Sequence, residues 1–210
     1  MAKLILLSDL IENDILLNKI VDIFEGKKPS IAYIPSCSDP DRKYFKTTAE
    51  FYNKIGIENV DYKDLDEEYD ETVISNIFEY NAIHLSGGNT FYFLHLMRKR
   101  GFIDSLRTYV RNGGVLIGVS AGSLLMTSTI ELAGYGEDGD LNCVGLEDMK
   151  ALGLVDFEFL PHWDGSENTE KSISHYAKAK NTTVYLCRDG DALIVTNTKI
   201  EFIGDIRVIN

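Results

Sequence analysis

The pentapeptide Gly118-Val119-Ser120-Ala121-Gly122 has the residue types and the spacing of a site for nucleophilic catalysis. It follows the apolar run Val115 to Val119 and precedes a helix-like segment, Ser123 to Thr127. In this context G-x-S-x-G forms a nucleophile elbow, a sharp turn that lifts the serine hydroxyl above the end of a strand. Small flanking residues avoid collision with neighbouring backbone. The pattern predicts that Ser120 is a nucleophile. The alternative interpretation is a tight strand-to-helix turn that happens to contain a serine.

A second glycine-rich turn lies earlier in the chain, at Leu85-Ser86-Gly87-Gly88-Asn89-Thr90-Phe91. It also follows an apolar run and opens a helix-like segment, so both turns are expected at the same carboxyl edge of one sheet. The amides of Gly88 and Ala121 would then converge on one oxygen atom and form an oxyanion hole. A phosphate-binding loop and an ordinary helix start are the alternative interpretations of this turn.

A serine nucleophile needs a general base, and the chain has four histidines. His84 lies within an apolar run and His95 lies in the middle of a helix-like segment, so both are interpreted as structural. His175 belongs to a polar helix and is interpreted as solvated. His162 follows Leu160-Pro161 at the end of an apolar stretch, where a strand gives way to a loop. The sequence therefore favours His162 as the base.

A third group, a carboxylate, is expected to orient the histidine and to stabilise its charged form. Aspartates in turns often serve only to form the turn, so the residues alone leave this position open. The candidates are Asp189 and Asp191, in a turn between two expected strands, and Asp138, Asp140 and Asp164, in expected loops.

The elements that must position these groups follow from hydrophobic periodicity. Runs of Ile, Leu and Val alternate with segments of helical spacing in the first 125 residues. Strands with little alternation of polarity are typical of a parallel sheet that helices cover on both faces. We predict an α/β fold with a doubly wound, mostly parallel sheet. The expected strands are 4–7, 31–34, 60–65, 82–85 and 115–119, and the expected helices are 11–24, 42–55, 71–78 and 91–111.

The rest of the chain predicts a loop and a small antiparallel C-terminal flank. Residues 131–150 are rich in Gly and Asp and lack clear periodicity, so we expect a long loop or hairpin beside the site. Short strands are expected at 183–186, 192–196 and 200–203, with a hairpin turn at 197–199. The length of 210 residues suits one domain over 1–210.

Composition excludes several classes of function. Hydrophobic residues make up 44% and charged residues 26% of the chain, as in ordinary globular proteins. The formal net charge of −12 repels phosphate backbones and anionic membrane surfaces, so we expect no nucleic-acid or membrane partner. Three cysteines without short paired spacing favour neither a disulfide framework nor a zinc site, and no metal is expected. The apolar run near the N-terminus is too short for a signal peptide, and the chain is expected to be cytoplasmic.

Four motifs together give the chain a family resemblance. They are the turn at 85–91, the elbow at 118–122, the segment Leu160-Pro161-His162 and the turn Arg188-Asp189-Gly190. Their order and spacing resemble the peptidase E family, the S51 serine peptidases that include aspartyl dipeptidase and cyanophycinase. The resemblance spans nearly the whole chain. It implies a fold similar to class I glutamine amidotransferase domains, which agrees with the doubly wound prediction.

Carried over position by position, the resemblance implies Ser120 as nucleophile, His162 as base and the amides near Gly88 and Ala121 as oxyanion hole. It also implies that Asn89 helps to shape the pocket.

Two positions depart from the family pattern. The family's acid is commonly a glutamate before a glycine in the late turn, and the matching residue here is Asp189, one methylene shorter, with Asp191 as the second candidate. Aspartyl dipeptidases carry an arginine after the histidine that is suited to pairing with the substrate's aspartate. Thr169 aligns there, and a neutral threonine cannot replace a bidentate clamp, although Lys171 and Arg188 are nearby cations. The sequence therefore disfavours strict Asp-X specificity.

The prediction that follows is a serine peptidase that hydrolyses short peptides without a cofactor. One alternative is an esterase of the α/β-hydrolase kind, but those enzymes order their triad Ser, acid, His, whereas His162 precedes Asp189 here. The other is a non-catalytic binding domain on the same scaffold. The expected partner is a short peptide substrate, and an edge strand at the C-terminus makes a homodimer possible.

Overall fold

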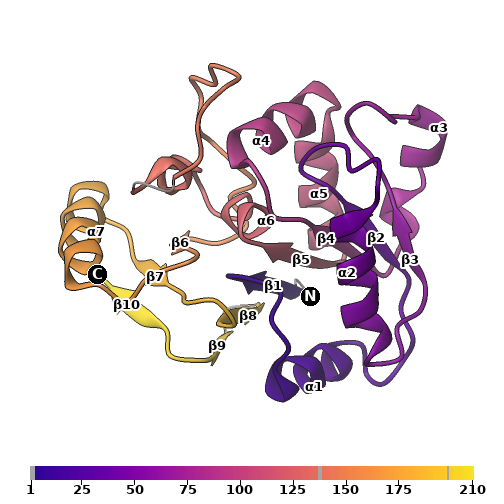
Figure 1. The fold of residues 1–210 in the computed structure, drawn as a ribbon, viewed down its shortest axis with the longest axis horizontal. Helices are drawn as coiled ribbons and strands as arrows, with labels where there is room; N and C mark the ends of the chain where they lie inside the picture. Colours follow the sequence, from indigo (N-terminus) through magenta and orange to yellow (C-terminus); the bar gives the residue numbers. More distant parts are fainter. Residues whose placement is uncertain (1–2, 137–138, 198) are drawn as a thin grey trace.

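A seven-stranded sheet in the order β3-β2-β4-β5-β1-β8-β9 forms the centre of the fold (Figure 1). The computed structural model describes residues 3–136, 139–197 and 199–210. Five strands run parallel, and β8 and β9 add an antiparallel hairpin beside β1. The strands are β1 (Lys3–Leu7), β2 (Ile31–Ile34), β3 (Val60–Tyr62), β4 (Ala82–Leu85), β5 (Val115–Val119), β8 (Ala192–Thr196) and β9 (Lys199–Ile203). The predicted mostly parallel sheet is confirmed.

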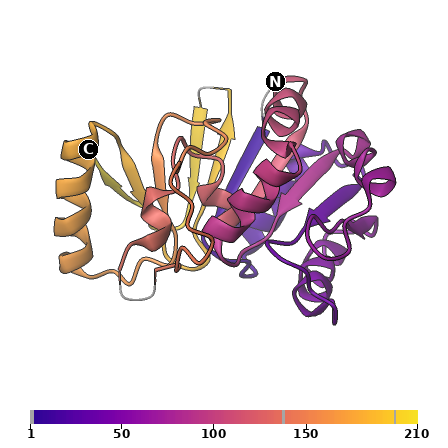
Figure 2. The same ribbon diagram turned by 90° about the horizontal axis from the view of Figure 1, so that it is seen from above.

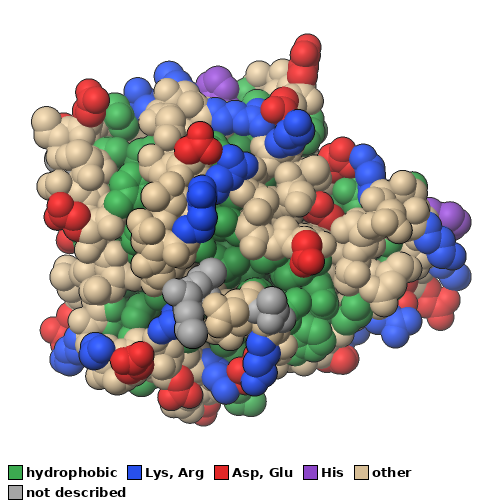
Figure 3. Space-filling model, turned by 180° about the vertical axis from the view of Figure 1, so that it is seen from behind, with side chains coloured by type: hydrophobic (Ala, Val, Ile, Leu, Met, Phe, Trp, Pro, Cys, Tyr) green, Lys and Arg blue, Asp and Glu red, His purple; other side chains and the backbone are tan. Residues whose placement is uncertain are grey.

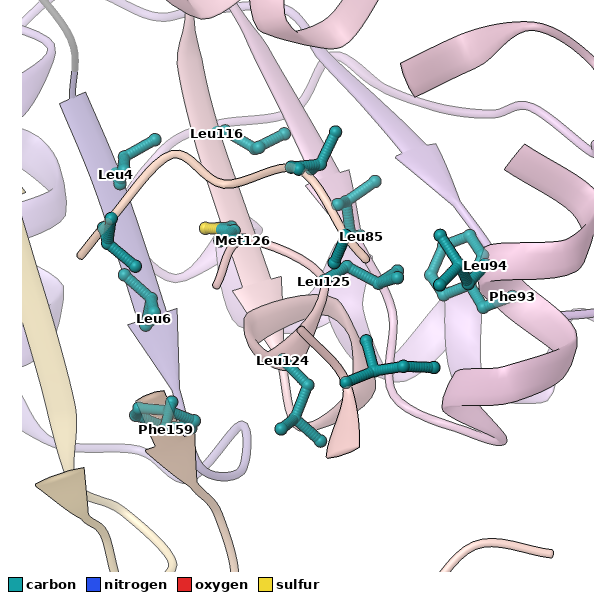
Figure 4. Close-up of a cluster of buried hydrophobic side chains, with 14 of the residues drawn as sticks. Leu4, Leu6, Leu85, Phe93, Leu94, Leu116, Leu124, Leu125, Met126 and Phe159 are labelled. Carbon is teal, nitrogen blue, oxygen red and sulfur yellow. The ribbon is translucent and has the colours of Figure 1, made fainter. Parts of the chain in front are cut away.

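Helices cover both faces of this sheet. Along β1, Leu4 and Leu6 join one buried cluster, whereas Ile5 and Leu7 join the other. The first cluster packs against α4 (Thr90–Lys99), α5 (Phe102–Arg111) and α6 (Ala121–Leu124), and part of it is shown in Figure 4. The second packs against α1 (Asp14–Ile23) and α2 (Lys43–Asn53). Because both faces are covered, β2, β4 and β5 are buried at every position and consist almost entirely of apolar residues. Shorter helical segments are α3 (Glu71–Ile74), η1 (Ile77–Glu79) and η2 (Glu131–Gly134).

A smaller sheet in the order β10-β7-β6 lies to one side of the main sheet, with α7 (Glu167–Lys180) next to it (Figure 2). Its strands are β6 (Glu158–Leu160), β7 (Val184–Leu186) and β10 (Arg207–Ile209). The antiparallel C-terminal flank is therefore divided, since β8 and β9 extend the main sheet while β10 pairs antiparallel with β7. In the predicted hairpin turn at 197–199, Thr198 lies outside the described residues.

One predicted helix is broken. The segment 91–111 forms two helices, α4 and α5, because Gly101 adopts a left-handed backbone with φ of 69° between them. The expected loop at 131–150 is confirmed over its described residues, which contain only η2 and the single bridge from Lys150 to Thr129.

His84 has the structural place that its position in an apolar run predicts. The ring is buried in β4, stacks on Tyr33 and shares a 2.9 Å hydrogen bond between Nδ1 and the hydroxyl of Tyr52. Burial lowers the pKa of His84 to about 3, so the imidazole is neutral at physiological pH. His84 therefore belongs to the core.

Glu158 is a buried acid at the start of β6, and its Oε2 atom has no hydrogen-bond partner within the described chain. Burial raises its pKa from 4.5 to about 7. Between these two values the folded protein binds more protons than the unfolded chain, so the free energy of unfolding falls as pH rises across this interval.

We expect Glu158→Gln to remove this dependence. Below pH 4.5 both proteins carry a neutral side chain and should unfold at similar urea concentrations. At pH 8 the variant should be more stable by up to about 3 kcal/mol, because only the wild type must bury a charge. Urea denaturation at pH 4 and pH 8 measures this difference, and an equal difference at both pH values would contradict the assignment.

The side of the molecule that faces away in Figure 1 exposes hydrophobic side chains between its charged groups (Figure 3). Phe202 of β9 is 46% exposed, and β9 is an edge strand of the main sheet. The homodimer that an edge strand makes possible stays a prediction.

None of the helices among the described residues is long and apolar enough to cross a membrane.

Candidate active site

Ser120 stands at a sharp turn between β5 and α6. Its backbone has φ of 49° and ψ of −106°, a conformation that non-glycine residues adopt at a cost. The turn is held from two sides, because the Ser120 amide donates to the Leu7 carbonyl at 2.9 Å and the Gly122 amide donates to the Ser86 carbonyl at 3.1 Å. The surrounding structure therefore fixes the strained serine at the carboxyl edge of the sheet.

The two elbow glycines allow close backbone packing. A Cβ atom at Gly122 would lie 2.2 Å from the Leu85 carbonyl oxygen, and one at Gly118 would lie 2.4 Å from the Gly122 carbonyl carbon. Neither position has room for a side chain, since the obstructing atoms are backbone. Glycine at both flanks is thus a packing requirement of this turn.

His162 joins Ser120 to Asp189. Its Nε2 atom lies 2.8 Å from Ser120 Oγ, and its Nδ1 atom lies 2.6 Å from Asp189 Oδ1. His162 follows β6, and Asp189 lies in the turn between β7 and β8. The side chains of His162 and Asp189 are 48% and 49% exposed, so solvent and ligands reach the site. The structure thus brings together the three residues that the family resemblance implied.

Ser8 is a residue of this site that the sequence reasoning missed. It is completely buried just after β1, and its hydroxyl accepts a 2.8 Å hydrogen bond from the His162 amide. The same hydroxyl lies 3.2 Å from the Cys187 carbonyl and 3.3 Å from Asp189 Oδ1, either of which can accept its single hydrogen. Ser8 therefore joins the segments that carry His162 and Asp189. The signal in the sequence was its place directly after an expected strand that ends at the same sheet edge.

The other candidate acids have different partners. Asp191 accepts hydrogen bonds from the amides of Arg188, at 2.8 Å, and Asp205, at 3.2 Å, and so stabilises its own turn. Asp140 accepts from the Thr90 amide at 2.7 Å, and Asp164 accepts from the Ser166 amide at 2.9 Å. Asp138 lies outside the described residues. Of the candidates that the structure describes, Asp189 alone has a hydrogen bond with His162.

The glycine turn after β4 lies against the elbow. A Cβ atom at Gly87 would be 3.6 Å from the Ser120 Cβ atom. Gly88 is exposed with φ of 128°, and Ala121 is the first residue of α6. Among the hydrogen bonds of residues 3–136, 139–197 and 199–210, none has the Gly88 or Ala121 amide as donor. Both amides are therefore available to an oxygen atom near Ser120.

An open cleft of about 710 Å³ adjoins Ser120 and His162. One wall comes from the segment around η2, and another comes from the loop after β6 and the start of α7. The described lining residues are Thr90, Ser120, Leu124, Leu132, Ala133, Tyr135, Gly136, Gly139, Asp140, Leu160, Pro161, His162, Trp163, Asp164, Ser166, Asn168, Thr169 and Ser172. No set of three or more His, Cys, Asp or Glu side chains within the described segments is arranged to hold a metal ion.

A model of peptidase family S51 matches residues 4–203. The chain belongs to peptidase family S51. It is therefore a serine-type peptidase, a class of hydrolase. The family membership that the four motifs predicted is confirmed.

Individual relatives agree with this membership. The uncharacterized peptidase YgaJ of Bacillus subtilis is 26% identical over 187 residues, which cover 86% of this chain and 75% of that protein. Peptidase E of a Nostoc species is 27% identical over 133 residues, 59% of this chain and 52% of that protein. A protein from Listeria monocytogenes EGD-e described as a candidate peptidase E has the same fold, with a TM-score of 0.77 at 22% identity over 97% of this chain and 98% of that one.

The family resemblance also implied that Asn89 helps to shape the pocket of an S51 peptidase and that Thr169 takes the position of the arginine in aspartyl dipeptidases. The Asn89 side chain is occupied at both ends, because Oδ1 accepts from the Tyr92 amide and Nδ2 donates to the Leu141 carbonyl, each at 2.9 Å. It caps α4 and holds the 131–150 segment. Thr169 lines the cleft, and its hydroxyl lies 3.4 Å from Asp164 Oδ1.

The two cations near Thr169 also have defined places in the S51 peptidase. Lys171 pairs with Glu167 at 3.3 Å on the outer side of α7. The Arg188 guanidinium lies 5.0 Å from the centre of the Trp163 ring and packs against Gly165. Neither residue belongs to the described lining of the cleft.

Proposed function

We propose that this S51 peptidase hydrolyses short peptides with Ser120 as nucleophile, His162 as general base and Asp189 as the orienting acid. The observation that carries the proposal is the continuous pair of hydrogen bonds from Ser120 Oγ through the imidazole to Asp189, at 2.8 and 2.6 Å. A serine needs a base within hydrogen-bond reach, and the base needs a third group that fixes its tautomer.

The chemistry follows from these contacts. Ser120 Oγ attacks the peptide carbonyl while His162 Nε2 takes its proton and then passes it to the leaving amine. Asp189 accepts the Nδ1 hydrogen throughout and stabilises the imidazolium that forms. The amides of Gly88 and Ala121 donate to the oxyanion. Water then attacks the acyl-enzyme with His162 again as base, which releases the acid product and restores Ser120.

The geometry also supports Asp189 in place of the family's glutamate. A shorter side chain can reach the imidazole only if its backbone approaches more closely. The Trp163 amide donates to the Cys187 carbonyl at 2.9 Å, and the Cys187 amide donates to the Leu160 carbonyl at 2.9 Å. These bonds draw the Asp189 turn toward the His162 loop, so an aspartate spans the gap.

Labelling of the purified protein with a fluorophosphonate and digestion of a library of dipeptides and tripeptides, followed by mass spectrometry, test this proposal. Modification at Ser120 together with cleavage of peptides would support it. Cleavage of short acyl esters without cleavage of any peptide would favour an esterase instead. No labelling and no turnover would favour a binding domain.

Ser8 should act as a positioning residue for this triad. We expect Ser8→Ala to lower kcat by about 10- to 100-fold with little change in KM, because the His162 loop and Asp189 lose a shared hydrogen-bond partner and shift from the productive geometry. Steady-state kinetics on one cleaved peptide measure this effect.

The matched control for Ser8→Ala is Thr48→Val, which removes a buried hydroxyl that lies on α2, away from the triad, and bonds to the Tyr44 carbonyl at 3.0 Å. A fall in kcat of similar size in both variants would show that Ser8 contributes general stability and no specific placement.

A further inference from the structure

The described lining of the catalytic cleft carries negative charge and no compensating cation. Asp140 and Asp164 belong to it, whereas Lys and Arg do not. The two aspartates come from different segments, one before Leu141 in the 131–150 loop and the other two residues after His162. Each reaches the cleft independently of the other.

Both carboxylates are held in place by hydrogen bonds from the backbone of neighbouring segments. Asp164 Oδ1 accepts from the Ser166 amide and lies within reach of the Thr169 hydroxyl, and these bonds lower the pKa of Asp164, which keeps it ionised. Asp140 Oδ2 accepts from the Thr90 amide. Each site thus offers a fixed acceptor that a ligand can use.

Two buried polar groups of the same walls also lack partners. Thr90 is fully buried and Trp163 is 8% exposed, and both residues line the cleft. No acceptor or donor in the described chain pairs with the Thr90 hydroxyl or the Trp163 indole nitrogen. Buried polar groups without partners are costly, and of these two only the Thr90 hydroxyl can accept a hydrogen from a cationic group.

We propose that the cleft selects peptides with a positive charge beside the scissile bond, an ammonium or guanidinium group that Asp164 and Asp140 receive. This inference rests on the proposed function, since it names the substrate class of the same site. Lys or Arg side chains and a free α-amino group share this chemistry. A charge-assisted hydrogen bond to a fixed carboxylate favours them over neutral and acidic groups.

Neither Arg188 nor Lys171 forms an ion pair with these two aspartates in the described chain. Arg188 stacks on Trp163 and makes no ion pair within the described chain, and Lys171 is engaged by Glu167. Thr169 presents a hydroxyl bonded to Asp164. The position that carries a substrate-pairing arginine in aspartyl dipeptidases is therefore occupied here by a threonine that bonds to the Asp164 carboxylate.

The test compares kcat/KM for peptides that differ only in an arginine or a citrulline, a neutral side chain of nearly the same shape. We expect the arginine peptide to be preferred by about tenfold or more, and the preference to shrink at high salt. Aspartyl and glutamyl peptides should be cleaved more slowly than the citrulline peptide. N-acetylated forms of each peptide distinguish recognition of the side chain, which survives acetylation, from recognition of the α-amino group, which does not.

Substitutions of the two aspartates show which of them recognises the positive charge of the peptide. Asp164→Asn and Asp140→Asn keep an acceptor oxygen and remove the charge, and Asp164→Asn should reduce the preference for the cationic peptide to about threefold or less. Glu71→Gln is the control, because it removes the same charge at the start of α3 from an exposed residue outside the described lining. It should leave the preference unchanged.

Equal cleavage of charged and neutral peptides by the wild type would overturn this inference. So would a preference for acidic peptides that Arg188→Gln abolishes. The citrulline peptide separates the two proposals, since its hydrolysis shows a working peptidase even where charge has no effect. If no peptide is cleaved and Ser120 is not labelled, the proposed function itself fails.

Discussion

Ser120→Ala is expected to lower kcat for every peptide that the wild type cleaves by a factor of about 10⁴ or more. The variant loses the oxygen that forms the acyl-enzyme, while His162 and Asp189 keep their own hydrogen bond. Residual turnover would come from binding and from the two free amides at Gly88 and Ala121. The fold should persist, because alanine and serine meet the same backbone constraint at φ of 49°.

Three measurements make this test decisive: turnover, fluorophosphonate labelling and the thermal midpoint of the same preparation. Ser75→Ala is the matched control, since Ser75 is an exposed serine after α3 that contacts Thr72 and Asn76. Turnover of Ser120→Ala at the wild-type rate would remove Ser120 from the mechanism. Loss of turnover together with loss of the folded state would call for the more conservative Ser120→Cys.

Gly122→Ala should have a large effect on folding for the addition of a single methyl group. The new Cβ atom would lie 2.2 Å from the Leu85 carbonyl oxygen and 2.8 Å from the Leu85 carbonyl carbon, so the end of β4 and the start of α6 must separate. This separation would strain the 3.1 Å hydrogen bond from the Gly122 amide to Ser86. We expect a loss of about 3 kcal/mol or more in the free energy of unfolding, a large part of what holds a domain of this size.

Urea denaturation of Gly122→Ala against Gly87→Ala measures this loss. A Cβ atom at Gly87 meets only ordinary contacts, the closest at 3.6 Å from Ser120 Cβ, and its backbone is not left-handed. The Gly87 variant should therefore unfold near the wild-type midpoint. Equal midpoints for both variants would show that the elbow accommodates a side chain and that the close approach is not needed for folding.

The parts of the site that the sequence predicted are those with a local signature. The elbow around Ser120 needs small residues between a strand and a helix, and His162 follows an apolar run and a proline. These groups lie at strand ends, and apolar runs in the sequence indicate strands directly. The parallel strands and their common edge followed from the same signal.

The sequence alone could not distinguish between Asp189 and Asp191, because the two residues are of the same type and lie in one turn. They differ only in the direction in which their side chains point. The folded chain separates them: Asp191 accepts amide hydrogens from Arg188 and Asp205, while Asp189 faces the imidazole. Ser8 was missed for the same reason, since its partners are 154 and 181 residues away in the chain. Hydrogen bonds between residues far apart in the chain leave no periodic pattern in the sequence.

The division of the proposed catalytic groups between two sheets has a consequence for how this protein can be observed. Ser120 belongs to the edge of the main sheet, His162 follows a strand of the small one, and Asp189 lies where the chain crosses from one sheet to the other. The chain's single tryptophan, Trp163, is next to His162 and is buried, and its amide bonds to the Cys187 carbonyl at the end of β7. Its intrinsic fluorescence is therefore a natural optical reporter of whether His162 is in place, and it can be read without any added label.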